Sequence, residues 1–176
     1  RTAVVTDGSE LLSEHFDHVT ATCGDISRVL DLYTDTTDWR GTEVHAQNGC
    51  VMLGSEEDNG FLMTPILPRT EGMVTVEFSV RRYSDDDKQP LFHICLATDA
   101  SSTEYIDQIS GYVPDSEFKN YYCVLGPLDT GSYITFISNS EYGSGDTPRI
   151  CLDNLSIYWG DRNEENPATS VPKAIT

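Results

Sequence analysis

The segment "NGFLMTPILPRTEGMVTVEFSV", residues 59–80, contains two strand-like halves that prolines separate. In the second half, residues 74–80, valine and phenylalanine alternate with threonine, glutamate and serine, the pattern of a strand with one buried face. The first half is equally apolar, but Pro65 and Pro68 interrupt it, and proline is confined to strand edges, strand starts and bulges. The segment therefore predicts a strand that starts in the core, bends at Thr64-Pro65 and crosses to the next long strand.

The rest of the chain consists of short apolar runs at even spacing with turn signals between them, and helical periodicity is nearly absent. Only "GDISRVLDLY" could form a turn or two of helix. Antiparallel strands with one apolar face pack as two sheets, so we predict an all-β, two-sheet antiparallel jelly-roll β-sandwich of about ten strands. The expected strands are Leu11–Val19, Glu43–Gln47, Cys50–Gly54, Gly60–Leu67, Met73–Ser84, Leu91–Thr98, Tyr105–Tyr112, Tyr121–Leu125, Tyr133–Ser138 and Arg149–Trp159.

One hairpin and the two ends of the chain have clear signals. Asn48-Gly49 joins two strands and is the preferred pair for a two-residue type I′ turn, in which both residues have positive φ. Residues 1–9 lack a core pattern and are interpreted as a leader or linker, and 10–162 as one sandwich domain. Residues 163–176 are polar and carry prolines, which favours a tail or interdomain linker.

The chain is strongly acidic. Eleven basic residues against 29 acidic ones give 11 − 29 = −18 at pH 7. Such a field repels nucleic acid and anionic membranes and favours divalent cations, although it is also typical of a soluble secreted or surface protein. No run approaches the roughly 18 apolar residues of a membrane span.

The five cysteines show no CxxC pair, so zinc-finger and thioredoxin-type sites lack support. Four of them, at positions 50, 95, 123 and 151, lie in expected strands, where a thiol behaves as a small apolar side chain. We expect buried free thiols. If one disulfide forms, two strand cysteines on facing sheets are the expected pair.

Three motifs, in order along the chain, resemble choice-of-anchor J, cleaved adhesin and MAM-like domains. They are "SEHFDHV" near the start, "GFLMTPIL" followed by "VTVEFSV", and "RICLDNLSIY" at the end. The resemblance spans about residues 11–159. It implies a galactose-binding-like jelly roll from a secreted or surface bacterial protein that serves in adhesion or glycan binding without catalysis. One departure is Asp153-Asn154, where the common pair is Asp-Asp.

A structural calcium site is expected where the first and last strands meet. Ca²⁺ takes six to eight oxygen ligands from carboxylates and carbonyls. Phe16 should point inward and turn Asp17 to the strand edge, and Leu152 should leave Asp153 at the same rim, with Glu14 able to join them. Similar jelly rolls hold calcium with an acid from each segment. The alternative is that these acids cap turns or pair with a basic residue.

Catalytic chemistry finds little support in the sequence. In a strand, His15 and Asp17 share a face that His18 opposes, and two ligands make a poor zinc site. No G-x-S-x-G motif and no cysteine in an electropositive setting is visible. We therefore predict that the protein is not an enzyme.

Aromatic side chains suggest where a hydroxyl-rich ligand would bind. Sugar sites combine aromatic faces with a few orienting polar groups. Tyr121 and Tyr133 are expected to face outward, and Trp39 either binds ligand or pins a long loop. The candidate ligand-binding residues are Tyr83, Tyr121, Tyr133, Arg81, Glu77 and Trp39.

The sequence thus predicts a non-catalytic extracellular carbohydrate-binding or adhesion module of a larger secreted or surface protein, monomeric as a domain. Its partner would be a glycan or a surface protein. The alternative is a structural or presentation domain with protein partners and no affinity for glycans.

Overall fold

The computed structural model describes residues 8–22, 24–56, 58–68, 71–84, 90–98, 105–113, 115–128, 131–139, 149–161 and 169–170. Within these ranges the chain is all-β, apart from the 3₁₀ turn η1. None of the helical residues there forms a segment long and apolar enough to span a bilayer. The elements are β1 (Glu10–Glu14), β2 (Gly24–Asp25), η1 (Leu30–Leu32), β3 (Arg40–Thr42), β4 (Val44–Gln47), β5 (Cys50–Leu53), β6 (Phe61–Met63), β7 (Gly72–Arg82), β8 (Leu91–Ala97), β9 (Asp107–Tyr112), β10 (Lys119–Leu128), β11 (Tyr133–Asn139), β12 (Ile150–Trp159) and β13 (Thr169–Ser170).

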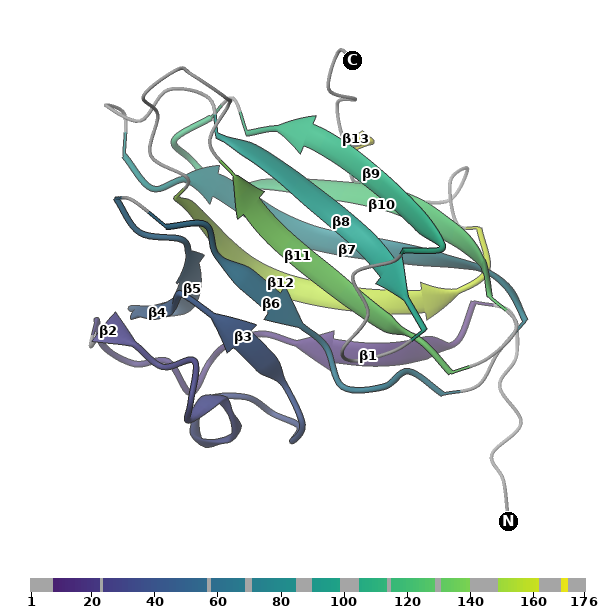
Figure 1. The fold of residues 1–176 in the computed structure, drawn as a ribbon, viewed down its shortest axis with the longest axis horizontal. Coiled ribbons are helices and arrows are strands. Elements are labelled where there is room, and N and C mark those ends of the chain that lie inside the picture. The colour runs from purple at the N-terminus through teal and green to yellow at the C-terminus, as the bar shows by residue number, and fades with distance from the viewer. Residues whose placement is uncertain are drawn as a thin grey trace.

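Two sheets form the layers of a sandwich (Figure 1). The larger sheet has the order β13-β10-β7-β12-β5-β4-β2, with β1 also paired to β12, and the smaller has the order β3-β6-β11-β8-β9. Among the described strands every pairing is antiparallel except that of β10 with β13. The predicted two-sheet antiparallel sandwich is confirmed, with more strands than the expected ten because several are only two or three residues long.

The proline-broken segment behaves as the sequence indicated. β6 lies between β3 and β11 in the five-stranded sheet, and β7 lies in the eight-stranded sheet. After β6 regular pairing ends, yet Thr64 stays attached to β11, because its backbone N–H donates to the Ile134 carbonyl and its Oγ1 accepts from the Ile134 N–H. Leu67 N–H then donates to the Ser132 carbonyl. The prolines therefore mark the crossover from one sheet to the other.

The core lies between the sheets and is built on the alternation of β7. Its apolar residues Val74, Val76, Phe78 and Val80 are buried and belong to one continuous cluster. Phe78 contacts rings from both sheets, with its centroid 5.7 Å from Phe136, 5.9 Å from Phe92 and 6.3 Å from Tyr121. The polar residues of β7 consequently point to the outer face of the eight-stranded sheet.

The first fifty residues depart most from the sequence prediction. β1 ends at Glu14 instead of continuing to Val19, because Phe16 adopts φ of 53°, which breaks an extended strand. The hairpin between β4 and β5 is confirmed. The predicted type I′ turn is wrong, because such a turn needs positive φ at both residues. Gly49 has φ of 83°, whereas Asn48 is not among the residues with positive φ. The Gly49 N–H instead donates to the Val19 carbonyl, which ties the turn to the loop after β1.

Candidate functional site

The outer face of the eight-stranded sheet carries an aromatic and carboxylate group at its centre. Tyr122 on β10 is the cross-strand partner of Glu77 on β7, and Glu77 in turn is paired with Ser156 on β12. Tyr158 lies on the same face of β12, opposite Thr75. Both tyrosines and Glu77 are half-buried. The two tyrosines thus flank β7, two strand spacings of about 5 Å each apart across the sheet and offset by two residues along the strands.

A second row of polar residues crosses the same face two residues farther along β7. Ser79 lies between Asn120 and Asp153 in the register, and its Oγ donates to Asn120 Oδ1 at 2.6 Å. Asp153 is half-buried, and its Oδ1 is buried without a hydrogen-bond partner in the described part of the chain. Burial raises the pKa of Asp153, and the negative charge of nearby Asp17 raises it further, against a hydrogen bond from the Asn154 backbone that lowers it.

The three residues of the expected calcium site do not all meet. Phe16 is buried and Asp17 is exposed, as predicted, and Asp17 lies close enough to Asp153 to act on its pKa. Glu14 instead pairs with Leu155, which belongs to the core, and is fully buried. Because Glu14 faces inward while Asp153 faces outward, these acids do not form a three-carboxylate cluster.

Glu14 has a different set of contacts. Its Oε2 accepts a hydrogen bond from the Phe16 backbone N–H at 3.0 Å, and its Oε1 accepts one from the Asp35 N–H at 2.7 Å. Burial raises the pKa of Glu14, and the two backbone hydrogen bonds oppose that shift. The carboxylate therefore joins the break after β1 to the loop that follows η1.

The two histidines of "HFDH" have different partners, and residues 15–18 do not form the strand that the prediction assumed. His15 Nδ1 lies 3.2 Å from Asn154 Oδ1, next to the bulge of β12. His18 Nε2 lies 3.2 Å from Asp35 Oδ1. The pair does not converge on one ion.

Two of the predicted ligand-binding aromatic residues belong to the core. Tyr121 is 4% exposed and packs near Phe78, so its predicted outward direction is wrong. Trp39 is 5% exposed and lies 6.1 Å from the Phe16 ring, with Nε1 donating to Thr36 Oγ1. Of the two roles open to Trp39, the structure therefore favours pinning the first long loop.

The remaining candidates are dispersed. Arg81 is on the outer face as predicted, but its guanidinium donates to the carbonyls of Arg82 and Tyr83 and lies 5.1 Å from the Phe118 ring. The Arg149 guanidinium covers a face of Tyr83 at 4.5 Å. Tyr133 is turned away from the core as predicted but lies on β11, in the other sheet. The predicted platform of Tyr83, Tyr121 and Tyr133 is wrong, whereas Glu77 and Arg81 face outward from β7 as predicted.

Sequence reasoning missed Tyr122 and Tyr158. In "KNYYCVLG" both phases of alternation are apolar, so the pattern does not by itself assign the buried face. The strand begins at Lys119, two residues earlier than predicted. That start places Asn120 in phase with Tyr122, and this polar residue is the signal that identifies the outward face.

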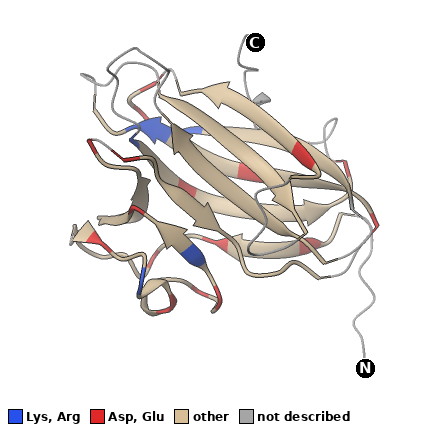
Figure 2. Ribbon diagram, viewed as in Figure 1, with Lys and Arg blue, Asp and Glu red and all other residues tan. Residues whose placement is uncertain are grey.

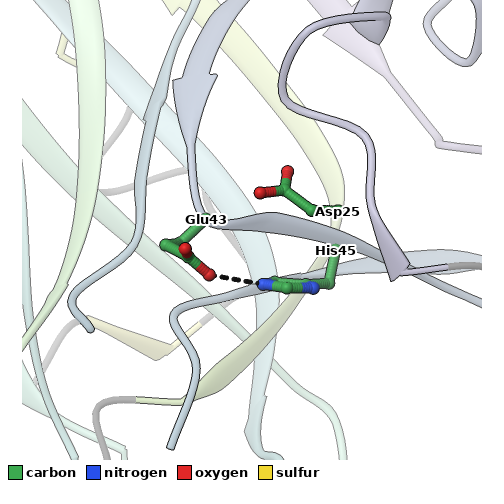
Figure 3. A group of neighbouring side chains, drawn as sticks. All are labelled: Asp25, Glu43 and His45. Atoms are coloured by element: carbon green, nitrogen blue, oxygen red, sulfur yellow. Dashed lines mark hydrogen bonds and ion pairs between the residues drawn. The ribbon is translucent and has the colours of Figure 1, made fainter. Parts of the chain in front are cut away.

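A mixed group of ligand-type side chains lies at the other end of the eight-stranded sheet. Asp25 on β2 is the cross-strand partner of His45 on β4, and Glu43 immediately precedes β4 (Figure 3). One ligand atom from each residue lies within 4.8 Å of the other two. His45 Nε2 and Glu43 Oε2 form a hydrogen bond of 2.7 Å. Within the described ranges, this is the one place where three such atoms gather.

The four described cysteines are buried free thiols, as predicted; Cys23 lies outside the described residues. Cys50 and Cys151 lie on adjacent strands of one sheet rather than on facing sheets, together with Met52. A hydrogen bond from Cys151 lowers the pKa of Cys50 against the effect of burial. Burial raises the pKa of Cys95 to about 12, which favours the protonated thiol at neutral pH.

Charge is unevenly distributed over the two sheets. Figure 2 shows acidic residues spread over strands and loops, whereas basic residues gather at few places, among them the end of β7. The only two arginines of β7 are Arg81 and Arg82. The corner that holds Asp25, Glu43 and His45 carries charges of both signs, because Arg28 lies close enough to act on the pKa of Asp25.

No protein-family description and no curated protein matches this sequence. Solved structures do match. One is a cleaved adhesin domain of Lys-gingipain from Porphyromonas gingivalis, with a TM-score of 0.58 at 13% identity over 85% of this chain and 99% of that one. Another cleaved adhesin domain of Lys-gingipain gives a TM-score of 0.56 at 16% identity over 88% and 100%.

The CBM22-1 xylan-binding domain of Xyn10C from Paenibacillus barcinonensis matches with a TM-score of 0.51 at 16% identity, over 88% of this chain and 97% of that one. At these identities the likeness concerns the fold. The chain thus has the sandwich architecture that occurs in adhesin domains and in carbohydrate-binding modules.

Proposed function

We propose that this protein is a non-catalytic carbohydrate-binding or adhesion module of a secreted or surface protein, and that it binds hydroxyl-rich ligands on the outer face of its eight-stranded sheet. The observation that carries the proposal is the placement of Tyr122 directly opposite Glu77 on one side of β7 and of Tyr158 diagonal to Glu77 on the other side. Aromatic rings pack against the C–H surfaces of sugars, and a carboxylate between them accepts hydrogen bonds from hydroxyl groups. The likeness in fold to adhesin and xylan-binding domains supports it.

Replacing Tyr122 by alanine tests the site. On a glycan array, followed by titration calorimetry with the best sugar, Tyr122→Ala should weaken binding about fivefold or more, because one lost aromatic contact is worth about 1 kcal/mol beyond its buried area. Tyr133→Ala is the matched control, since Tyr133 is also half-buried but lies on the other sheet. Glu77→Gln should reduce affinity while leaving the aromatic contacts in place.

Two outcomes would contradict the proposal. An equal loss of sugar affinity in Tyr122→Ala and Tyr133→Ala would show that the ligand does not bind on the outer face of the eight-stranded sheet. No sugar bound by the wild type, together with self-association or capture of a purified surface protein, would favour a structural or presentation domain.

We also propose that Asp17 and Asp153 contribute to a structural calcium site without Glu14. The buried, unpartnered Oδ1 of Asp153 and its raised pKa support this, because a divalent cation would satisfy that oxygen and neutralise the repulsion from Asp17. Backbone carbonyls and water would complete the six to eight oxygen ligands that Ca²⁺ requires.

The variant Asp153→Asn tests this site both without divalent cations and with added Ca²⁺. Without divalent cations, the raised pKa of Asp153 means that folding disfavours the ionised carboxylate. The protonated Asp153 side chain therefore contributes stability below the ordinary pKa of aspartate, and this stability is lost as the pH rises through the raised pKa. The asparagine variant should therefore melt at a higher temperature than the wild type at pH 7 in chelator. Added Ca²⁺ should raise the melting temperature of the wild type and not that of the variant. If Ca²⁺ stabilises both proteins equally, Asp153 is not a ligand.

A further inference from the structure

We propose that Asp25, Glu43 and His45 form a binding site for a divalent transition-metal ion of the zinc type, separate from the calcium site proposed at Asp17 and Asp153. The three side chains come from two strands and the junction before one of them, and they converge on one point at the sheet corner (Figure 3). The donor set decides the class of metal. Calcium and magnesium take oxygen ligands, whereas an imidazole nitrogen together with two carboxylates suits zinc and its neighbours.

The geometry is close to that of a three-ligand zinc site. Bond lengths of about 2.0–2.2 Å in a tetrahedral site place ligand atoms about 3.3 Å apart. The present atoms lie within 4.8 Å of one another, so closure requires movements of about 1.5 Å or less, which side-chain rotation supplies. Three protein ligands would leave a fourth position for water or for an oxygen of an outside ligand.

Glu43 occupies a backbone position that its residue type does not favour. It is the single residue between β3 in the smaller sheet and β4 in the larger sheet, and it has φ of 52°. Its carbonyl accepts the Gly54 N–H at 2.9 Å, which fixes this turn. Glycine or asparagine adopts such a conformation with less strain, so the turn alone does not explain a glutamate here. The turn directs its carboxylate at His45, at 2.7 Å.

A backbone hydrogen bond holds the Asp25 carboxylate in place. Its Oδ1 accepts the Ser27 backbone N–H at 2.8 Å. His45 and Glu43 are 19% and 26% exposed, which leaves the corner accessible to an ion from solvent. A bound metal would also clip β2, only two residues long, to β4.

Zinc titration of the tag-free protein tests the site. By isothermal calorimetry the wild type should bind one zinc ion per chain at this corner, and Zn²⁺ should raise its melting temperature. Asp25→Asn and Glu43→Gln keep the shape of each side chain and should each weaken zinc binding at least about 10–100-fold, the loss that even an outer-shell partner of a metal typically causes. His45→Ala should abolish binding. His18→Ala, which removes a histidine paired with an aspartate elsewhere, is the matched control and should bind as the wild type does.

Cobalt spectroscopy separates this site from the thiols of Cys50 and Cys151. Bound Co²⁺ should show visible d–d bands of a four-coordinate nitrogen and oxygen site, without a sulfur-to-cobalt charge-transfer band. Circular dichroism of each variant checks that it is folded. The proposal is overturned if folded Asp25→Asn and Glu43→Gln bind zinc like the wild type, if the cobalt spectrum reports thiolate ligation, or if the wild type shows no stoichiometric zinc binding. None of these outcomes bears on sugar binding at Tyr122.

Discussion

Glu14→Ala should lower the free energy of unfolding by about 3 kcal/mol, because it leaves two backbone N–H groups without their acceptor in the protein interior. Those groups belong to Phe16 and Asp35, and the carboxylate that joins them is fully buried. Urea denaturation at pH 7 measures the change. Glu14→Gln should cost less, since its amide oxygen still accepts one of the two hydrogen bonds.

Glu10→Ala is the control for this experiment, because Glu10 is an exposed acid at the other end of the same strand. It should change stability by no more than about 0.5 kcal/mol. If Glu14→Ala costs no more than Glu10→Ala, the carboxylate does not hold the loop. If its cost appears only when Ca²⁺ is present, Glu14 is a calcium ligand after all.

Gly60→Ala should destabilise the protein by more than about 3 kcal/mol, the upper part of the range for overpacking. A Cβ at this position would overlap the backbone nitrogen of Gly54 and lie 2.6 Å from the Leu53 carbonyl carbon. These are backbone atoms, so no side-chain rotation relieves the overlap. Gly60 cannot shift freely either, because its N–H donates to Ser138 Oγ and its carbonyl accepts the Ser138 N–H, both at 2.9 Å.

Gly49→Ala provides the comparison. Gly49 has φ of 83°, but nothing lies within 4 Å of its added Cβ, so alanine there suffers only the strain of a left-handed conformation, about 1–2 kcal/mol. Thermal melting of both variants should therefore rank Gly60→Ala well below Gly49→Ala. The reverse order would show that β5 and the start of β6 separate easily.

Long strands were predictable because burial on one side leaves a period of two in the sequence. β7 shows this pattern from Val74 to Val80, and the predicted range Met73–Ser84 agrees with Gly72–Arg82 to within two residues. β2 and β3 were not predictable, because two or three residues are too few to show a period. They exist through pairing with β4 and β6, which the local sequence does not encode.

The candidate sites were predictable only in part, because a site depends on which strands become neighbours. Glu77 was placed correctly from the alternation of one strand. Tyr122 was missed because both faces of β10 are apolar, and a one-residue error in phase exchanged it with Tyr121. Asp25, Glu43 and His45 lie close in sequence, but they converge only because of the positive φ at Glu43 and the pairing of β2 with β4.

The central position of β12 has a consequence for how the chain is made. This strand, Ile150–Trp159, is hydrogen-bonded to β7, β5 and β1. Among the described strands β1 has no other partner, and β7 and β5 acquire their second partner only when β12 arrives. Synthesis proceeds from the N-terminus at about 5–20 residues per second, and β1 and β5 leave the ribosome long before residue 150. Until then their open edges are templates for pairing with other chains. A nascent chain that stops short of Ile150 is thus a substrate for chaperones or for aggregation, and the sandwich closes in a late step dominated by contacts distant in sequence.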